Sequence, residues 1–201
     1  MDNSKYRLSF TAASLRLPEM SEMAKRFLEE GHKNITKDAI ITGGNTRTTD
    51  REFRELKFRL ETLTPQQLEF LAFGDFLIQK QIALLSICKL YGFIRDFIVE
   101  VLREKALVFD FQLTDGEYNT FFRRKSEVHP ELDAIADSTA RKVKQVTYKM
   151  LEQTGLIDNI VSKKIIPQIV DGKVIRAVVD DDPKWLKIYL LSDMQVSNSS
   201  L

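Results

Sequence analysis

The sequence predicts a predominantly all-α protein: a compact multi-helix bundle with helix-turn-helix units and a possible small β-hairpin or wing near the C-terminus. Side chains that cap helix N-termini stand directly before runs whose apolar residues recur at helical spacing. Glycines and prolines stand where those runs end. A stretch rich in isoleucine and valine, residues typical of strands, follows residue 155 and carries the hairpin prediction.

Composition limits the class of protein before any element is considered. At 201 residues, 43% of them hydrophobic, the chain is long enough for one large domain or two small ones. Its 30 basic and 29 acidic residues leave a net charge of +1, so a nucleic-acid surface requires local segregation of charge. Cys88 is the single cysteine, and the N-terminus lacks the apolar run of a secretory signal. These features predict a cytoplasmic protein.

The N-terminal region predicts a pair of helices with a tight joint. The first covers 19–30, stops at Gly31 and points one side inward, namely Met20, Met23, Ala24, Phe27 and Leu28. A shorter helix at 36–42 follows it. The pair carries several bases, although acids dilute their charge: Lys25, Arg26, Lys33 and Lys37.

A loop at 43–49, with the sequence GGNTRTT, leads into the next helix. Thr49 and Glu52 form a capping box that predicts a helix from there to Leu63. Glycine amides, hydroxyls and Arg47 at a helix start form one possible phosphate site. A solvated loop with an ordinary cap is the alternative interpretation. The loop lacks Gly-Lys-Ser/Thr and is therefore not a nucleotide-binding P-loop.

The middle of the chain predicts buried helices. Thr64 and Pro65 begin a helix at 66–73, and Asp75 begins an almost wholly apolar helix at 76–91. Gly92 separates or bends the next helix, at 94–107. Charged and amide side chains interrupt 76–101, which argues against a membrane span. Residues 109–113 alternate between apolar and polar and predict an extended joint between two halves.

A short helix with a basic end is predicted after this joint. Thr114 and Glu117 form a second capping box, and the helix ends in three consecutive bases, Arg123, Arg124 and Lys125. His129-Pro130 then breaks the helix before a possible single turn at 131–135.

The following helix, at 137–155, has the most segregated charge in the chain. Asp137 or Ser138 is able to cap its start, Gly155 is suited to close its end, and no acid stands between Ser138 and Leu151. One side packs, namely Ala140, Val143, Thr147, Met150 and Leu151. The other side is basic and polar, namely Arg141, Lys142, Lys144, Gln145 and Lys149. A solubilising surface and a polyanion-binding face are the two interpretations. Together with the preceding helix, it has the outline of a helix-turn-helix.

The C-terminal segment leaves two alternatives open. Asp171-Gly172 divides two Ile- and Val-rich runs within 156–180, which predicts a hairpin similar to a wing. Alternatively, Asp171 caps a short helix that ends at Asp180. The polar stretch 192–201 predicts a flexible tail. The domain organisation we expect is an N-terminal helical region at 1–108, a helix-turn-helix or winged-helix-like region at 109–191, and this tail.

Motifs that carry catalysis or bind cofactors are missing from the sequence. His32 and His129 are the only histidines, and neither has metal-ligand spacing or belongs to a nucleophile motif. Dinucleotide-binding glycine patterns and zinc-binding cysteine pairs do not occur. We therefore expect a binding protein rather than an enzyme, with no cofactor, no metal, no membrane and no small-molecule substrate.

Several blocks, spaced from about Tyr6 to Pro183, resemble the BrxA family, a small core component of bacteriophage exclusion (BREX) defence systems. The blocks are KYRLSFTAASL, FIRDFIVEVLREKAL, LTDGEYNTFF, DSTARKVKQVTYKMLEQTGLI and a late DDDP. The resemblance implies an all-helical, NusB-like cytoplasmic protein whose helix-turn-helix units bind double-stranded DNA. In this chain, the Ile- and Val-rich stretch at 160–179 is longer and more strand-like than we expect of the family.

Double-stranded DNA and other proteins of the defence system are thus the expected partners. The predicted DNA-binding residues are Arg141, Lys142, Lys144, Gln145, Lys149, Arg123, Arg124, Lys125, Lys25, Lys33, Lys37, Arg47, Thr48 and Arg51. A protein-interaction scaffold within the defence complex is the alternative, favoured by the near-neutral net charge. A NusB-like RNA-binding protein is a third, with less support because no aromatic platform for single strands is evident.

Overall fold

The computed structural model describes residues 5–31, 35–41 and 46–199. Its order of elements confirms the all-α prediction. The first half contains η1 (Ser9–Ala12), α1 (Leu17–Glu30), η2 (Lys37–Ala39), α2 (Thr46–Leu60), α3 (Pro65–Phe73), α4 (Phe76–Leu90), α5 (Gly92–Phe97), η3 (Ile98–Leu102) and α6 (Arg103–Leu107). The second half contains α7 (Asp115–Ser126), α8 (Pro130–Asp133), α9 (Asp137–Thr154), α10 (Gly172–Val179), η4 (Pro183–Tyr189) and α11 (Asp193–Ser199).

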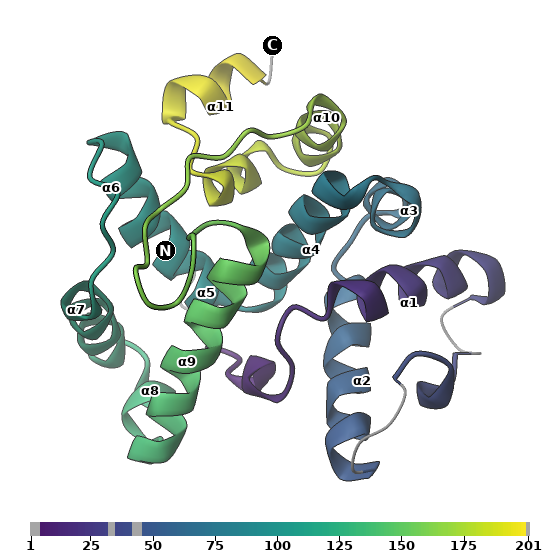
Figure 1. The fold of residues 1–201 in the computed structure, drawn as a ribbon, viewed down its shortest axis with the longest axis horizontal. Helices are drawn as coiled ribbons and strands as arrows, with labels where there is room; N and C mark the ends of the chain where they lie inside the picture. The colour runs from purple at the N-terminus through teal and green to yellow at the C-terminus, as the bar shows by residue number, and fades with distance from the viewer. Residues whose placement is uncertain (1–4, 32–34, 42–45, 200–201) are drawn as a thin grey trace.

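Helix α4 runs through the middle of the molecule, as its nearly uniform apolar sequence predicts (Figure 1). On one side of it lie α1, α2 and α3, and on the other lie α5 to α9. The carboxylate of Asp75 accepts a 3.0 Å hydrogen bond from the amide of Ile78 and so caps α4 as predicted. Helices α10 and α11 pack beside the end of this arrangement, and η4 contacts α4 and α6.

The region before α3 differs from its prediction in two places. The expected helix at 36–42 is only the 3-10 turn η2, and Thr42 lies outside the described residues. The capping box at Thr49 and Glu52 does not begin α2, because the helix already starts at Thr46 and Thr49 is buried inside it. Side chains of α1 that face inward are buried as predicted, except Leu28, which is 39% exposed.

Helices α5 and α6 are joined through a π-helical segment, η3. Gly92 begins α5, and a Cβ at this position would lie 3.2 Å from the ring of Tyr6, so a larger residue would crowd that ring. Phe93 and Phe97 point into an aromatic cluster in which their rings lie 5.4 and 5.1 Å from that of Phe121. The cluster fastens α5 to α7, since edge-to-face aromatic packing favours centroid separations in this range.

The hairpin predicted near the C-terminus is not formed. Within the described residues, β-type pairing is limited to two isolated bridges, Gln112 with Lys164 and Ile157 with Ile165. Asp171 instead caps α10 by accepting a 2.7 Å hydrogen bond from the amide of Lys173, so the helical alternative is confirmed. Where the sequence predicts a loose tail, α11 forms, with Val196 buried.

Candidate nucleic-acid interface

Helix α9 forms over the predicted residues and divides into a buried and a basic side. Val143, Thr147, Met150 and Leu151 are buried, while Ala140 is only half-buried. Gly155 closes the helix with φ of 78°, in the left-handed region that favours glycine. The predicted cap is wrong: the N-cap is Ala136, which makes no side-chain bond, and Asp137 is the first helical residue. Its carboxylate still lies where the helix dipole favours negative charge.

The outer side of α9 presents a row of exposed cationic and amide groups. Arg141, Lys142, Gln145 and Lys149 are all exposed. The ammonium of Lys142 lies 3.4 Å from the amide oxygen of Gln145, one turn away. Lys149 forms an ion pair with Glu152 on the same helix. Exposed pairs of this kind contribute little to stability, so Lys149 can exchange its partner for a phosphate at low cost.

Lys144 differs from these residues because it turns toward α7. Its ammonium lies 3.4 Å from the carboxylate of Asp115 and 3.3 Å from the amide oxygen of Asn119. It also lies 5.3 Å from the centre of the Tyr118 ring. Lys144 therefore positions α9 on α7, and only part of its charge faces solvent.

The capping box that opens α7 is present with both of its hydrogen bonds, as predicted from Thr114 and Glu117. The three basic residues at the C-terminal end of this helix lie in different surroundings. Arg123 is exposed, whereas Arg124 forms a 2.7 Å ion pair with Glu100. Lys125 is buried, and its ammonium lies 2.9 Å from Asp96 and 2.7 Å from Glu100. The buried lysine thus holds α7 against α5 and η3, and its charge is engaged by two carboxylates.

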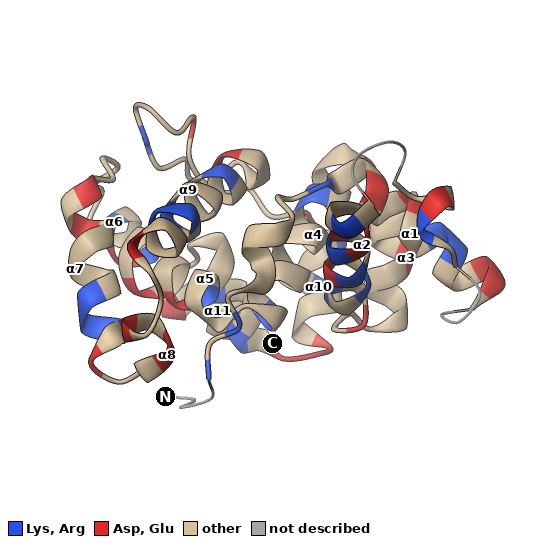
Figure 2. Ribbon diagram, turned by 90° about the horizontal axis from the view of Figure 1, so that it is seen from below, with Lys and Arg blue, Asp and Glu red and all other residues tan. Residues whose placement is uncertain are grey.

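A loop at 158–166 adds two cations that the sequence pattern does not single out. Figure 2 shows this loop beside α9, and the loop and the helix each carry segments coloured blue for lysine or arginine. Lys163 pairs with Asp115 at 3.1 Å and lies over the ring of Tyr148 on α9, while Lys164 is exposed. Partial burial of Asp115 raises its pKa, but a hydrogen bond from Lys163 and the charge of Lys144 lower it below the usual value. One ionised carboxylate therefore joins α7, α9 and this loop.

The N-terminal candidates lie elsewhere in the fold. The start of α2 is on the opposite side of α4 from α9 (Figure 1), and it exposes Arg47, Thr48 and Arg51. Lys37 forms a 2.7 Å ion pair with Asp50, and Lys25 is half-buried on α1. Lys33 lies outside the described residues, as do the glycines of the predicted phosphate loop. Arg47 and Thr48 belong to a helix rather than to a loop.

The described part of the chain holds neither a metal cluster nor a membrane-spanning helix. No three His, Cys, Asp or Glu side chains there are placed to share a metal ion. None of its helices combines the length and apolar character that crossing a bilayer requires. Cys88 is fully buried, and this burial raises the pKa of its thiol, which makes the group unreactive.

Comparison with known proteins identifies the family. The BrxA family model matches residues 4–181. Over 160 residues the chain is 30% identical to the BREX protein BrxA of Bacillus cereus, covering 77% of this chain and 80% of that protein. It is 21% identical to the BREX protein BrxA of Paramagnetospirillum magneticum, covering 98% and 100%. A crystal structure of an uncharacterized protein from Magnetospirillum magneticum shares the fold, with a TM-score of 0.79 and 20% identity over 93% of this chain and 98% of that one. The chain belongs to the BrxA family.

Proposed function

We propose that this chain is a non-enzymatic, double-stranded-DNA-binding component of a BREX-type anti-phage defence system. Its relatives carry the name BREX protein BrxA, which supports the defence role. The observation that carries DNA binding is the exposed row on α9, in which Arg141, Lys142 and Gln145 follow one another within little more than a turn. The proposal places the chain in the cytoplasm, where DNA of an infecting phage is met.

In the proposed complex, α9 lies in the major groove as the second helix of a helix-turn-helix formed with α7. Arg141, Lys142 and Lys149 bind phosphates, and Lys164 extends this contact from the neighbouring loop. Gln145 is placed to reach a base edge, since an amide pairs well with adenine. Lys144 fixes the orientation of α9 through Asp115 and Asn119 and leaves the groove contacts to the exposed row.

The net charge of +1 means that affinity depends on local charge, because the molecule as a whole supplies no attraction for a polyanion. A second contact through Arg47, Thr48 and Arg51 at the start of α2 would increase affinity. Since this group and α9 lie on different sides of α4, they engage separate stretches of a bent duplex or two duplexes.

The test compares duplex binding of wild-type protein with that of Arg141→Ala/Lys142→Ala at two salt concentrations. Each lost phosphate contact lowers the slope of log affinity against log salt by about 0.9, so the double variant is expected to lose a slope of roughly 2. Lys173→Ala/Arg176→Ala is the matched control, because both side chains lie on α10, away from the α9 row. Unchanged affinity and slope in the α9 variant, or an equal loss in the control, would refute the role of α9.

A second candidate function is a protein-interaction scaffold in the same defence complex. Exposed apolar residues gather around the α3–α4 corner, where Phe73 is 63% exposed, Phe76 70% and Leu77 43%. The corner is tight, because a Cβ on Gly74 would lie 2.5 Å from the carbonyl oxygen of Phe70. Neighbouring apolar side chains that remain exposed on a rigid corner are typical of protein interfaces.

The scaffold function predicts that Phe73→Ser/Phe76→Ser abolishes copurification with the other proteins of the defence system after nuclease treatment. Met194→Ser is the control, since Met194 is 75% exposed at a different place, on α11. If nuclease treatment abolishes copurification of the wild-type protein, the association depends on bridging by DNA, which favours the DNA-binding function. Competition between duplex DNA and RNA for the α9 surface tests the RNA-binding alternative.

A further inference from the structure

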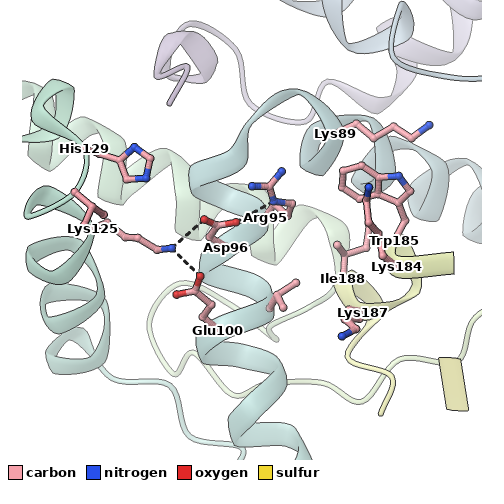
Figure 3. Close-up of a pocket in the computed structure, with 12 residues that line it drawn as sticks. Lys89, Arg95, Asp96, Glu100, Lys125, His129, Lys184, Trp185, Lys187 and Ile188 are labelled. Carbon is pink, nitrogen blue, oxygen red and sulfur yellow. Dashed lines mark hydrogen bonds and ion pairs between the residues drawn. The ribbon is translucent and has the colours of Figure 1, made fainter. Parts of the chain in front are cut away.

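A cavity of about 580 Å³ lies between three parts of the fold that are far apart in sequence (Figure 3). One wall comes from α5 and η3, another from the end of α7 and its connection to α8, and the third from η4. None of its lining residues belongs to α9, so the cavity is distinct from the proposed duplex interface. Its volume lies within the usual range of small-molecule sites.

The wall formed by η4 has a regular pattern. A 3-10 helix repeats every three residues, so side chains three apart lie above one another. Lys184 and Lys187 therefore form a cationic stripe, and Trp185 and Ile188 form an apolar stripe beside it, in which Trp185 is half-buried and Ile188 is buried. The third stripe, Leu186 and Tyr189, is buried in the core and holds the helix in place. The cavity thus receives two stripes at once, one charged and one apolar.

The lining is positively charged overall. Five of its side chains are basic and two are acidic: Lys89, Arg95, Lys125, Lys184 and Lys187 against Asp96 and Glu100. Both acids are already engaged, since Lys125 contacts each of them and Arg95 lies 2.9 Å from Asp96. Figure 3 shows this paired group on the side opposite Trp185 and Lys184.

Among the cations that line the cavity, the two lysines of η4 can exchange their present carboxylate partners for an anionic ligand most easily. The side chain of Lys184 is 65% exposed and pairs with Asp182, while Lys187 pairs with Asp193, whose side chain is 73% exposed. Ion pairs this open to water contribute little, so an incoming anion replaces the carboxylate at small cost. Lys89, by contrast, is held by Asp181, Gln67 and the carbonyl oxygen of Thr62.

We propose that this cavity binds a nucleotide, with the base against Trp185 and the phosphate held by the lysines of η4, Lys184 and Lys187. A flat aromatic ring makes use of stacking on the indole, and the phosphate makes use of the positive charge that the lysines of η4 supply. Asp96 and Glu100 on the far side disfavour an anionic chain that crosses the whole cavity. The nucleotide comes either free or as the end of a single strand of nucleic acid, and the two sources share this chemistry.

The test uses the fluorescence of Trp185, because it is the single tryptophan of the sequence. The full chain is titrated with adenosine monophosphate, with adenosine, with inorganic phosphate and with a short 5′-phosphorylated single-stranded DNA. Saturable quenching is expected with adenosine monophosphate, and binding of phosphate or adenosine alone is expected to be at least about tenfold weaker, since each makes only one of the two contacts. Tighter binding of the single strand identifies a strand end as the source, and tighter binding of the mononucleotide identifies the free form.

Two variants distinguish this site from a general affinity of the protein surface for anions. Lys184→Gln/Lys187→Gln is expected to weaken nucleotide binding by about tenfold or more, since it removes both charge-assisted contacts, while Lys173→Gln/Arg176→Gln on α10 leaves binding unchanged. Trp185→Phe, followed by calorimetry, should weaken binding of the nucleotide and not of phosphate. An absence of quenching in the millimolar range, equal affinity for phosphate and nucleotide, or equal losses in the α10 control would overturn the proposal. Arg141→Ala/Lys142→Ala retains nucleotide binding, so this site and the duplex interface fail or hold independently.

Discussion

The phenolic hydroxyl of Tyr6 donates a 2.6 Å hydrogen bond to the carboxylate of Asp96, joining the N-terminal segment to α5. The Tyr6 ring also stacks on His129, with centroids 3.7 Å apart, and its backbone amide donates to Glu131. Asp96 in turn accepts from Lys125 and Arg95. A single carboxylate thereby connects three segments of the chain.

Tyr6→Phe removes this hydrogen bond and keeps the stacked ring. The expected loss in the free energy of unfolding is about 1.5–3 kcal/mol at neutral pH, the usual value for a bond to a charged acceptor. Urea unfolding of both proteins measures it.

The loss should depend on pH. Burial raises the pKa of Asp96, but hydrogen bonds from Tyr6 and Lys125 and the charge of Arg95 lower it below its usual value of 3.8. The unfolded chain therefore binds the proton first, so the contribution of Asp96 is complete above about pH 5 and declines as the pH falls toward the folded-state pKa. The difference between wild type and Tyr6→Phe should shrink in acid, and a constant difference would contradict the role of the ionised carboxylate.

Arg59 on α2 is expected to be essential for stability. Its side chain is fully buried and donates to the carbonyl oxygens of Ala13 and Ser14, each at 2.7 Å, and to the hydroxyl of Tyr91 at 3.2 Å. Arg59→Lys keeps the charge but cannot reach three acceptors with one ammonium, so we expect a loss of at least about 3 kcal/mol. Thermal unfolding should show a midpoint lower by roughly 6–12 °C. Arg54→Lys, on the exposed side of α2, should stay within about 0.5 kcal/mol of wild type.

Two glycines provide opposite predictions for the same substitution. Gly155→Ala places a Cβ on a left-handed residue with φ of 78° and 2.9 Å from the ammonium of Lys80, so a loss of about 1–2 kcal/mol is expected. Gly116→Ala lies in the first turn of α7 with its nearest neighbour, the Thr114 hydroxyl oxygen, at 3.7 Å. It should gain about 0.5–1 kcal/mol. Chemical unfolding of both variants tests this, and a gain at Gly155 would contradict the cap.

The bases at the end of α7 should separate into structural and surface residues. Lys125→Ala removes the ammonium partner of Asp96, which keeps its contacts with Arg95 and Tyr6, so a loss of about 1.5–3 kcal/mol is expected. Arg123→Ala should change stability by less than about 0.5 kcal/mol. At a temperature where both variants are folded, Lys125→Ala should bind duplex DNA as wild type does. Weaker duplex binding by folded Lys125→Ala would show that its charge reaches the polyanion.

Local capping signals predict some helix ends correctly and others wrongly, since the caps expected at Thr49 and at Asp137 or Ser138 are not formed. The caps at Thr114, Asp75 and Gly155 are single-residue effects that depend on neighbours within a few positions, and each is confirmed. The hairpin failed because Ile- and Val-rich composition reports a preference for extended backbone and says nothing about a partner strand. The helical alternative, which depended on the single cap at Asp171, was the correct one.

Features that depend on distant neighbours were out of reach of the sequence. Nothing near Lys125 shows that Asp96 lies 29 residues earlier and holds its charge. The stripes on η4 do not stand out in the sequence because their period is three, whereas the pattern of an amphipathic α-helix has a period of 3.6. Lys164 does not stand out in the sequence, because the Ile- and Val-rich residues around it predict a strand.

The contacts of the N-terminal segment also constrain the order of events during synthesis. The backbone amide of Tyr6 donates to Glu131, which lies 125 residues further along the chain. The backbone amide of Leu15 donates to Gln153, which lies 138 residues further along. A ribosome adds about 5–20 residues per second, so these partners emerge several seconds to half a minute after the segment itself. During that interval Phe10, which is fully buried in the finished protein, lacks much of its cover. The beginning of this chain is therefore where a chaperone has the longest opportunity to bind.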